Sequence, residues 1–245
     1  MNNNRPKHAI FDPLSSKHPN WMWKVRTVVG KIQDKLHYHA MILDIGAGRC
    51  ELAEYLSANF RCEVIALDIC IEGFLKYKQR VKLRGEPKYN SLHLIIADGR
   101  KLPFRTGVFD AAYYWATLHH MPNYYSSLLE VRKVLKKRGT LLLYETNALS
   151  PFRKLDEFFY RVKGEYESSF LPFIIKKNIS SLFILKYFSS NYEYFGPFCF
   201  YGATSIYHPP LEKLRNHVKR LYHMLTRKHL FSIFGGAILI VAVKP

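Results

Sequence analysis

Three features are scarce in this sequence of 245 residues: cysteines, long apolar runs and acidic residues. The four cysteines form no Cys-x-x-Cys pair, which argues against a zinc site or disulfide framework and fits a reducing, cytoplasmic environment. The longest apolar run, 231–243, is shorter than the roughly 20 residues that span a bilayer, so we expect a buried terminal strand there. No apolar run follows Met1–Arg5, and we therefore expect no signal peptide.

Acidic residues number 19 against 37 lysines and arginines, which gives a formal net charge of +18 at pH 7. Such an excess favours contact with a polyanion, either RNA or an anionic membrane surface. It is equally compatible with a solvated basic surface, because no tract has more than a few consecutive basic residues. The charge therefore leaves all three interpretations open.

Short apolar runs alternate with segments of helical periodicity through much of the chain. This alternation is typical of a doubly wound α/β sheet with buried parallel strands. Ligands of such sheets bind beyond the carboxyl ends of the strands, where the strand order reverses. The expected strands are 41–45, 63–67, 92–97, 111–115 and 140–144, and the expected helices are 51–60, 71–83 and 125–135, the last ended by Gly139.

The remaining segments suggest additions to this core of 41–146. We expect an N-terminal helical cover over 1–40, an aromatic-rich helical cap or insertion over 147–230, and a terminal strand of the core sheet within 231–245. Within the cap, 211–225 has the pattern of a basic amphipathic helix. Such a helix either rests on an anionic membrane or packs on the sheet.

A glycine turn follows the first expected strand, in Asp44-Ile45-Gly46-Ala47-Gly48. Its glycines permit unusual backbone angles and let a ligand lie against the main chain. The helix that follows offers free N–H groups to a carboxylate. Asp44, two residues before the first glycine, can meet a cationic amine. The turn is therefore suited to the amino-acid tail of a ligand.

Two further aspartates follow later strands. Asp68 can accept hydrogen bonds from both hydroxyls of a ribose. Asp98, beside Gly99, can accept from the exocyclic amine of adenine, while Ile69 and Leu102 enclose the ring. The three acids and the glycine turn together predict a site for S-adenosylmethionine. A nicotinamide dinucleotide fits less well, because its third fingerprint glycine would fall at Glu51.

These motifs resemble those of class I S-adenosylmethionine-dependent methyltransferases, of the type called methyltransferase domain family eleven. The resemblance covers about residues 40–146 and the final strand. It implies a Rossmann-like, doubly wound sheet of seven strands, mostly parallel with an antiparallel last strand, and S-adenosylmethionine as cofactor. It is carried by Asp44–Gly48, Asp68, Ala97-Asp98-Gly99 with Leu102-Pro103-Phe104, Phe109-Asp110-Ala111 through Leu118-His119-His120, and the turn Val134–Thr140.

Two positions depart from the family pattern. Cys50 stands where a third glycine is usual, and Lys137-Arg138 stand where proline and glycine are common. We further expect Trp115 and Ala116 to contact the methionine portion of the cofactor through their backbone.

Candidate catalytic residues are His119, His120 and Glu145, which follow the fourth and fifth expected strands. An imidazole titrates near neutral pH, so either histidine suits a general base or the lining of an acceptor site. The alternative is that the histidines bond loop carbonyls and shape the pocket, and that Glu145 is a helix cap or ion-pair partner. The other histidines lack metal-ligand spacing, so we expect no metal site.

The methyl acceptor is less visible in the sequence. Aromatic residues are dense between 145 and 207, and as a cap they would build an apolar chamber for a small-molecule or lipid-like acceptor. The basic surface keeps RNA, either tRNA or rRNA, as the alternative, and 211–225 keeps peripheral membrane contact open. A non-enzymatic binder is disfavoured by the intact cofactor motifs, and the sequence gives no indication of oligomeric state.

Overall fold

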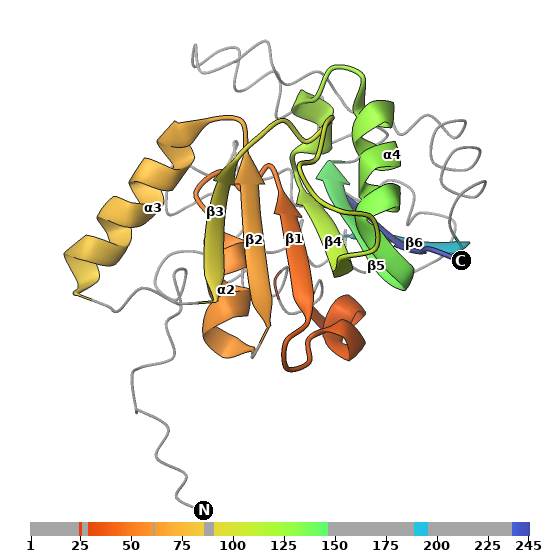
Figure 1. Cartoon of the computed structure of the whole chain (residues 1–245), viewed down its shortest axis with the longest axis horizontal. Helices are drawn as coiled ribbons and strands as arrows, with labels where there is room; N and C mark the ends of the chain where they lie inside the picture. Colours follow the sequence, from red (N-terminus) through yellow and green to blue (C-terminus); the bar gives the residue numbers. More distant parts are fainter. Residues whose placement is uncertain (1–24, 26–28, 61, 86–90, 147–188, 196–236) are drawn as a thin grey trace, which may run out of the picture. The chain divides into compact units, whose positions relative to one another are not determined.

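The computed structural model describes Val25 and residues 29–60, 62–85, 91–146, 189–195 and 237–245 (Figure 1). The chain divides into two compact units. Unit 1 comprises residues 1–113 and 125–140, and unit 2 comprises residues 114–124 and 141–245.

The strands form a Rossmann-like α/β sheet in the order β3-β2-β1-β4-β5-β7-β6. The pairs β1–β2 and β2–β3 are parallel, whereas β6 and β7 are antiparallel. The expectation of a mostly parallel sheet with an antiparallel last strand is thereby confirmed. The strands are β1 (Met41–Ile45), β2 (Glu63–Asp68), β3 (Leu92–Ile96), β4 (Phe109–Trp115), β5 (Leu135–Thr146), β6 (Ser189–Phe195) and β7 (Ala237–Val243).

The strand order reverses at β1, which lies between β2 and β4. This is the switch point at which doubly wound sheets bind ligands, beyond the carboxyl ends of the strands. In β1 and β2 the side chains facing both ways are buried, among them Leu43, Ile45, Val64 and Leu67. Each such aliphatic side chain contributes roughly 1.5–3 kcal/mol by its removal from water. The core of unit 1 therefore holds the strand ends that carry the candidate site.

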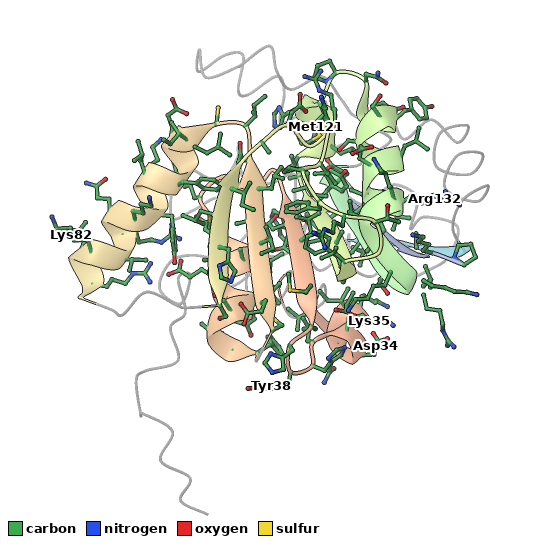
Figure 2. All side chains as sticks on the ribbon, viewed as in Figure 1. Asp34, Lys35, Tyr38, Lys82, Met121 and Arg132 are labelled. Carbon is green, nitrogen blue, oxygen red and sulfur yellow. The ribbon has the colours of Figure 1, made fainter. Side chains whose placement is uncertain are left out.

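Three helices of the described chain lie close to their expected positions: α2 (Glu51–Asn59), α3 (Ile71–Arg84) and α4 (Tyr124–Val134). Helix α3 buries Phe74, Tyr77 and Val81, whose spacing keeps them on one face, and Gly85 ends it in the left-handed conformation. Its outer face is basic, and Figure 2 shows Lys82 on the side of α3 away from the strands. Two short 3-10 helices, η1 (Gln33–Lys35) and η2 (Leu118–His120), are also present, and residues 29–32, directly before η1, are helical.

Two expectations about secondary structure are wrong. Gly139 does not end α4, because α4 ends at Val134 and β5 begins at the next residue. The carbonyl of Val134 already accepts a hydrogen bond from the N–H of Val108 at 2.8 Å, so strand pairing starts before the glycine. Residues 189–195, expected within the helical cap, form β6. Its polar and aromatic residues alternate with the period of two that strands prefer, and it pairs with β7 along its whole length.

The rest of the expected cap, including the basic segment 211–225, lies outside the described residues, as does most of the N-terminal cover. The expected terminal strand is present as β7. In the described part of the chain, no helix has the length and apolar character needed to cross a membrane.

Candidate cofactor site and a buried histidine–glutamate pair

The glycine turn after β1 is built from left-handed residues at alternate positions. The φ angles are 73° at Gly46, 50° at Gly48 and 57° at Cys50. The N–H groups of Gly46 and Ala47 both donate to the carbonyl of Leu67, at 2.8 and 3.1 Å. These bonds fix the turn, which we call the cofactor loop (residues 46–50), to the end of β2. The left-handed angle at Cys50 explains why glycine suits that position and implies a strain of roughly 1–2 kcal/mol for the cysteine.

Asp44 lies just before this loop and is almost fully buried, with 2% of its surface exposed. Burial raises the pKa of its carboxyl group to about 8; the Tyr113 hydroxyl lowers this pKa and the negative charge of Asp68 raises it further. Within the described residues, neither Oδ1 of Asp44 nor the hydroxyl of Tyr113 makes a hydrogen bond of good geometry. A buried carboxylate oxygen without a hydrogen-bond partner costs free energy unless a bound cation pairs with it.

Asp68, at the end of β2, joins the cofactor loop to α3. Its Oδ2 accepts from the N–H of Gly48 at 2.7 Å, and its Oδ1 accepts from the N–H of Cys70 at 2.9 Å. A carboxylate has about four lone-pair sites, so acceptor capacity remains for ribose hydroxyls. The adjacent Ile69 is 65% exposed, an arrangement that suits covering one face of an adenine ring.

Asp98 lies two residues beyond the end of β3 rather than at its last position. Arg100 engages both of its carboxylate oxygens, with Nε at 3.0 Å from each and Nη2 at 2.7 Å from Oδ2. The backbone N–H of Arg100 also donates to Oδ1, at 2.8 Å. These bonds from Arg100 lower the pKa of Asp98, so the carboxylate is ionised and shared with an arginine. An adenine amine would have to share this acceptor with the guanidinium.

Helix α4 holds the loop that carries Asp98. The hydroxyl of Ser127 donates to the carbonyl of Gly99 at 2.8 Å, and the N–H of Leu102 donates to Oε2 of Glu130 at 3.0 Å. Ser127 is fully buried, and Leu102 is 6% exposed. The expected adenine residues Gly99 and Leu102 are therefore fixed by two α4 side chains that sequence reasoning missed.

Unit 2 carries a buried pair formed by His119 and Glu145. The distance from Nδ1 of His119 to Oε2 of Glu145 is 2.6 Å, and the two side chains are 3% and 1% exposed. Oε1 of Glu145 accepts the N–H groups of Thr117 and Leu118, at 3.0 and 2.7 Å. The carboxylate thus holds the turn at η2 through three contacts. The ring of the exposed His120 lies 4.0 Å from that of His119, centroid to centroid.

Trp115 and Ala116, the other expected cofactor contacts, also lie in unit 2. The Trp115 ring stacks on Tyr144, with centroids 4.3 Å apart and planes 12° from parallel. Ala116 has a φ of 50°, and its N–H donates to the carbonyl of Tyr144 at 2.7 Å. These contacts fix the chain at the end of β4.

Unit 1 therefore brings together Asp44, the cofactor loop and Asp68, whereas His119 and Glu145 meet in unit 2. No group of three potential metal ligands occurs in the described residues. The unit 1 residues fit S-adenosylmethionine on the observed chemistry. The unpaired oxygen of Asp44 suits its ammonium group, and the main chain at Gly48 faces open space because a Cβ there would have no atom within 4 Å.

Comparison with known proteins agrees with this chemistry. Residues 43–143 match the family model described as a methyltransferase domain. A tRNA (carboxymethyluridine(34)-5-O)-methyltransferase of Xenopus tropicalis is 26% identical over 145 residues, a match covering 56% of this chain and 20% of the relative. A demethylmenaquinone methyltransferase of Staphylococcus haemolyticus is 24% identical over 166 residues, covering 63% and 67% respectively. This chain thus spans only a fifth of the length of the first relative.

A solved structure supports the fold. Phosphoethanolamine N-methyltransferase 2 of Haemonchus contortus, in complex with phosphomonomethylethanolamine and S-adenosylhomocysteine, superposes with a TM-score of 0.61 at 16% identity. The match covers 91% of this chain and 52% of that one. At this identity the likeness shows the shared fold alone.

Proposed function

We propose that this chain, whose residues 43–143 form a class I S-adenosylmethionine-dependent methyltransferase domain, transfers a methyl group to a small-molecule or lipid-like acceptor. The observation that carries the proposal is the buried carboxyl group of Asp44, directly before the cofactor loop, whose Oδ1 makes no hydrogen bond among the described residues. A cationic amine is the group that such a carboxylate needs. S-adenosylmethionine, the family's cofactor, has an ammonium group on the same tail whose carboxylate suits the N–H groups of the loop.

The bound cofactor would supply an electrophilic methyl group on a sulfonium centre. That methyl group would pass to a nucleophilic atom of the acceptor, and the sulfur would keep the electron pair of the broken carbon–sulfur bond. The chain's contribution is alignment: Asp44 and the cofactor loop hold the tail, Asp68 the ribose, and Asp98 the adenine. Holding two reactants in line can lower the barrier by roughly 7–11 kcal/mol.

We assign the binding of the methyl acceptor to the region of the His119–Glu145 pair and the adjacent His120. Because Glu145 already accepts three hydrogen bonds, its role in the proposal is to hold the turn rather than to meet the acceptor. His120 is exposed and stands next to the fixed ring of His119, so His120 is the side chain we assign to the acceptor. If the acceptor must lose a proton, a histidine base contributes roughly 10²–10⁴-fold.

The acceptor class rests on sequence composition and on the names of relatives. Aromatic residues are dense between 145 and 207, and one relative is named for demethylmenaquinone. The proposal includes a cytoplasmic location, with peripheral membrane contact through 211–225. The test is incubation with methyl-labelled S-adenosylmethionine and fractionated cell extract. Label in the small-molecule or lipid fraction is expected, and label only in RNA or protein would overturn the acceptor assignment.

A second candidate is methylation of RNA, and one feature of unit 1 favours it. Residues 132–138 hold five basic side chains, of which Lys137 and Arg138 are exposed. Among the described residues, no acid lies within ion-pair distance of these two. Arg138 has a φ of 62°, so an arginine occupies a backbone position that suits glycine. Residues 132–138, which we call the basic segment, run from the end of α4 into β5. Figure 2 shows Arg132 on α4, at the start of this segment.

The RNA candidate predicts binding that weakens steeply as salt rises. Fluorescence anisotropy with labelled tRNA between about 50 and 200 mM salt measures that dependence. A protein that purifies free of nucleic acid and ignores tRNA at low salt would exclude this candidate and leave the apolar acceptor.

A further inference from the structure

We propose that α3 locks the cofactor loop in its binding conformation, with Gly73 and Arg80 as positioning residues; the proposal rests on the proposed function. Sequence reasoning assigned no role to either residue. Both project from the same face of α3, about two turns apart, and both act on the loop through its backbone.

Gly73 lets the helix touch the loop backbone directly. A Cβ built on Gly73 would lie 2.1 Å from the carbonyl oxygen of Gly48 and 2.5 Å from its carbonyl carbon. Backbone atoms cannot yield as a flexible side chain can, so an alanine here must shift either α3 or the loop. The opposite side of Gly48 is also held, because its N–H donates to Asp68 at 2.7 Å. The peptide of Gly48 is thus confined between α3 and the ribose acid.

Arg80 holds the next residue of the loop. Its Nη2 donates to the carbonyl oxygen of Arg49 at 3.0 Å and to Oε2 of Glu54 at 2.6 Å. Glu54 lies on α2, is fully buried, and also accepts from Nη1 of Arg84 at 3.2 Å. The Arg80 guanidinium therefore ties α3, the loop and α2 together in one place.

The energetic consequence follows from burial. A carboxylate taken out of water must keep its charged partners, so Glu54 fixes where Arg80 lies. Because Arg80 is fixed by Glu54, its hydrogen bond to the Arg49 carbonyl also fixes the position of the loop. Cofactor binding then needs less ordering of the loop, since a pre-organised site loses less conformational freedom on binding. Substitutions of Gly73 or Arg80 that release the loop should therefore weaken cofactor binding even in protein that remains folded.

Arg80→Met and Arg84→Met form a matched pair. Each removes one guanidinium from Glu54, but only the first removes the bond to the Arg49 carbonyl. Isothermal titration of S-adenosylhomocysteine into the full chain should give a Kd about tenfold weaker for Arg80→Met than for Arg84→Met, as expected for a lost hydrogen bond from a charged donor. Hydrogen exchange of residues 46–50 in ligand-free protein should be faster in Arg80→Met only.

Gly73→Ala provides a second perturbation that changes no charge, with Lys76→Ala on the exposed face of α3 as its control. We expect at least tenfold weaker binding for Gly73→Ala and wild-type affinity for Lys76→Ala. If Arg80→Met does not fold, Arg80→Lys preserves the charge beside Glu54 and takes its place. A merely structural role would lower the melting temperature without changing the Kd of the folded protein.

The outcomes separate the two proposals. Equal affinities for Arg80→Met and Arg84→Met, or wild-type affinity for Gly73→Ala, overturn the lock while the proposed function stands. A wild-type chain that binds neither S-adenosylhomocysteine nor S-adenosylmethionine overturns both.

Discussion

Replacing Asp44 by Asn should remove most of the pH dependence of cofactor binding. The pKa of Asp44 is raised to about 8, chiefly by burial, so near neutral pH the ligand-free protein holds this carboxyl group mostly protonated. A cofactor ammonium group binds best to the ionised form. At pH 7, one unit below that pKa, ionising Asp44 costs about 1.4 kcal/mol, and at pH 6 about twice as much.

Wild-type affinity for S-adenosylhomocysteine should therefore tighten by up to about tenfold per pH unit between roughly pH 6 and 7.5. Binding should release close to one proton in this range. Titration calorimetry in two buffers of different ionisation enthalpy measures both quantities. Asp44→Asn should bind more weakly at pH 7.5, release far fewer protons and show a nearly flat affinity. Equal proton release by the two proteins would refute the assignment of Asp44 to the ammonium group.

The same pKa shift fixes the sign of a stability effect. The folded pKa of Asp44 lies above its ordinary value of 3.8, so between these two values the folded protein retains a proton that the unfolded chain loses. The retained proton therefore contributes to the free energy of unfolding. This stabilising contribution is fully present below about pH 4 and is lost as pH rises through about 8, with a slope of up to about 1.4 kcal/mol per pH unit. Urea denaturation of ligand-free protein should show the slope in the wild type and lack it in Asp44→Asn.

Three further predictions concern the cofactor loop, the His119–Glu145 pair and the basic segment. Cys50→Gly should be more stable than Cys50→Ala by about 1 kcal/mol, because only glycine relieves the left-handed strain; urea denaturation showing the reverse order would contradict this. Glu145→Gln should lower the free energy of unfolding by about 2–3 kcal/mol, because an amide has one acceptor oxygen for three donors, whereas the exposed Glu72→Gln should stay within about 0.5 kcal/mol. If RNA is bound through the basic segment, Lys137→Glu with Arg138→Glu should reduce the salt slope of tRNA binding by about two; an unchanged slope excludes the segment from the interface.

The sequence predicted those parts of the site that depend on local pattern. Asp44 and Asp68 lie at the carboxyl ends of β1 and β2, and the loop glycines follow β1, so their meeting at one sheet edge follows from strand order alone. Glu54 and Arg80 could not be paired in this way. They are far apart in the sequence, and nothing near either residue indicates the other.

For Gly73, by contrast, the sequence does contain an indication of its role. A glycine inside a helix costs about 1 kcal/mol relative to alanine, and such a residue often marks a close approach of two backbones. The end of α4 was predicted wrongly for a different reason, because Gly139 has the character of a helix stop. Pairing of Val108 with Val134 overrides that local preference, and Arg138 supplies the left-handed residue instead.

The position of Asp68 explains why a shift of α3 should weaken cofactor binding. One of its oxygens holds the N–H of Gly48, and the other holds the N–H of Cys70, which lies directly before α3. The residue assigned to the ribose is therefore the same residue that joins the loop to the helix locking it. A shift of α3 would move the tail site and the ribose site together, so the two ends of the cofactor should be recognised as one unit rather than as two independent contacts.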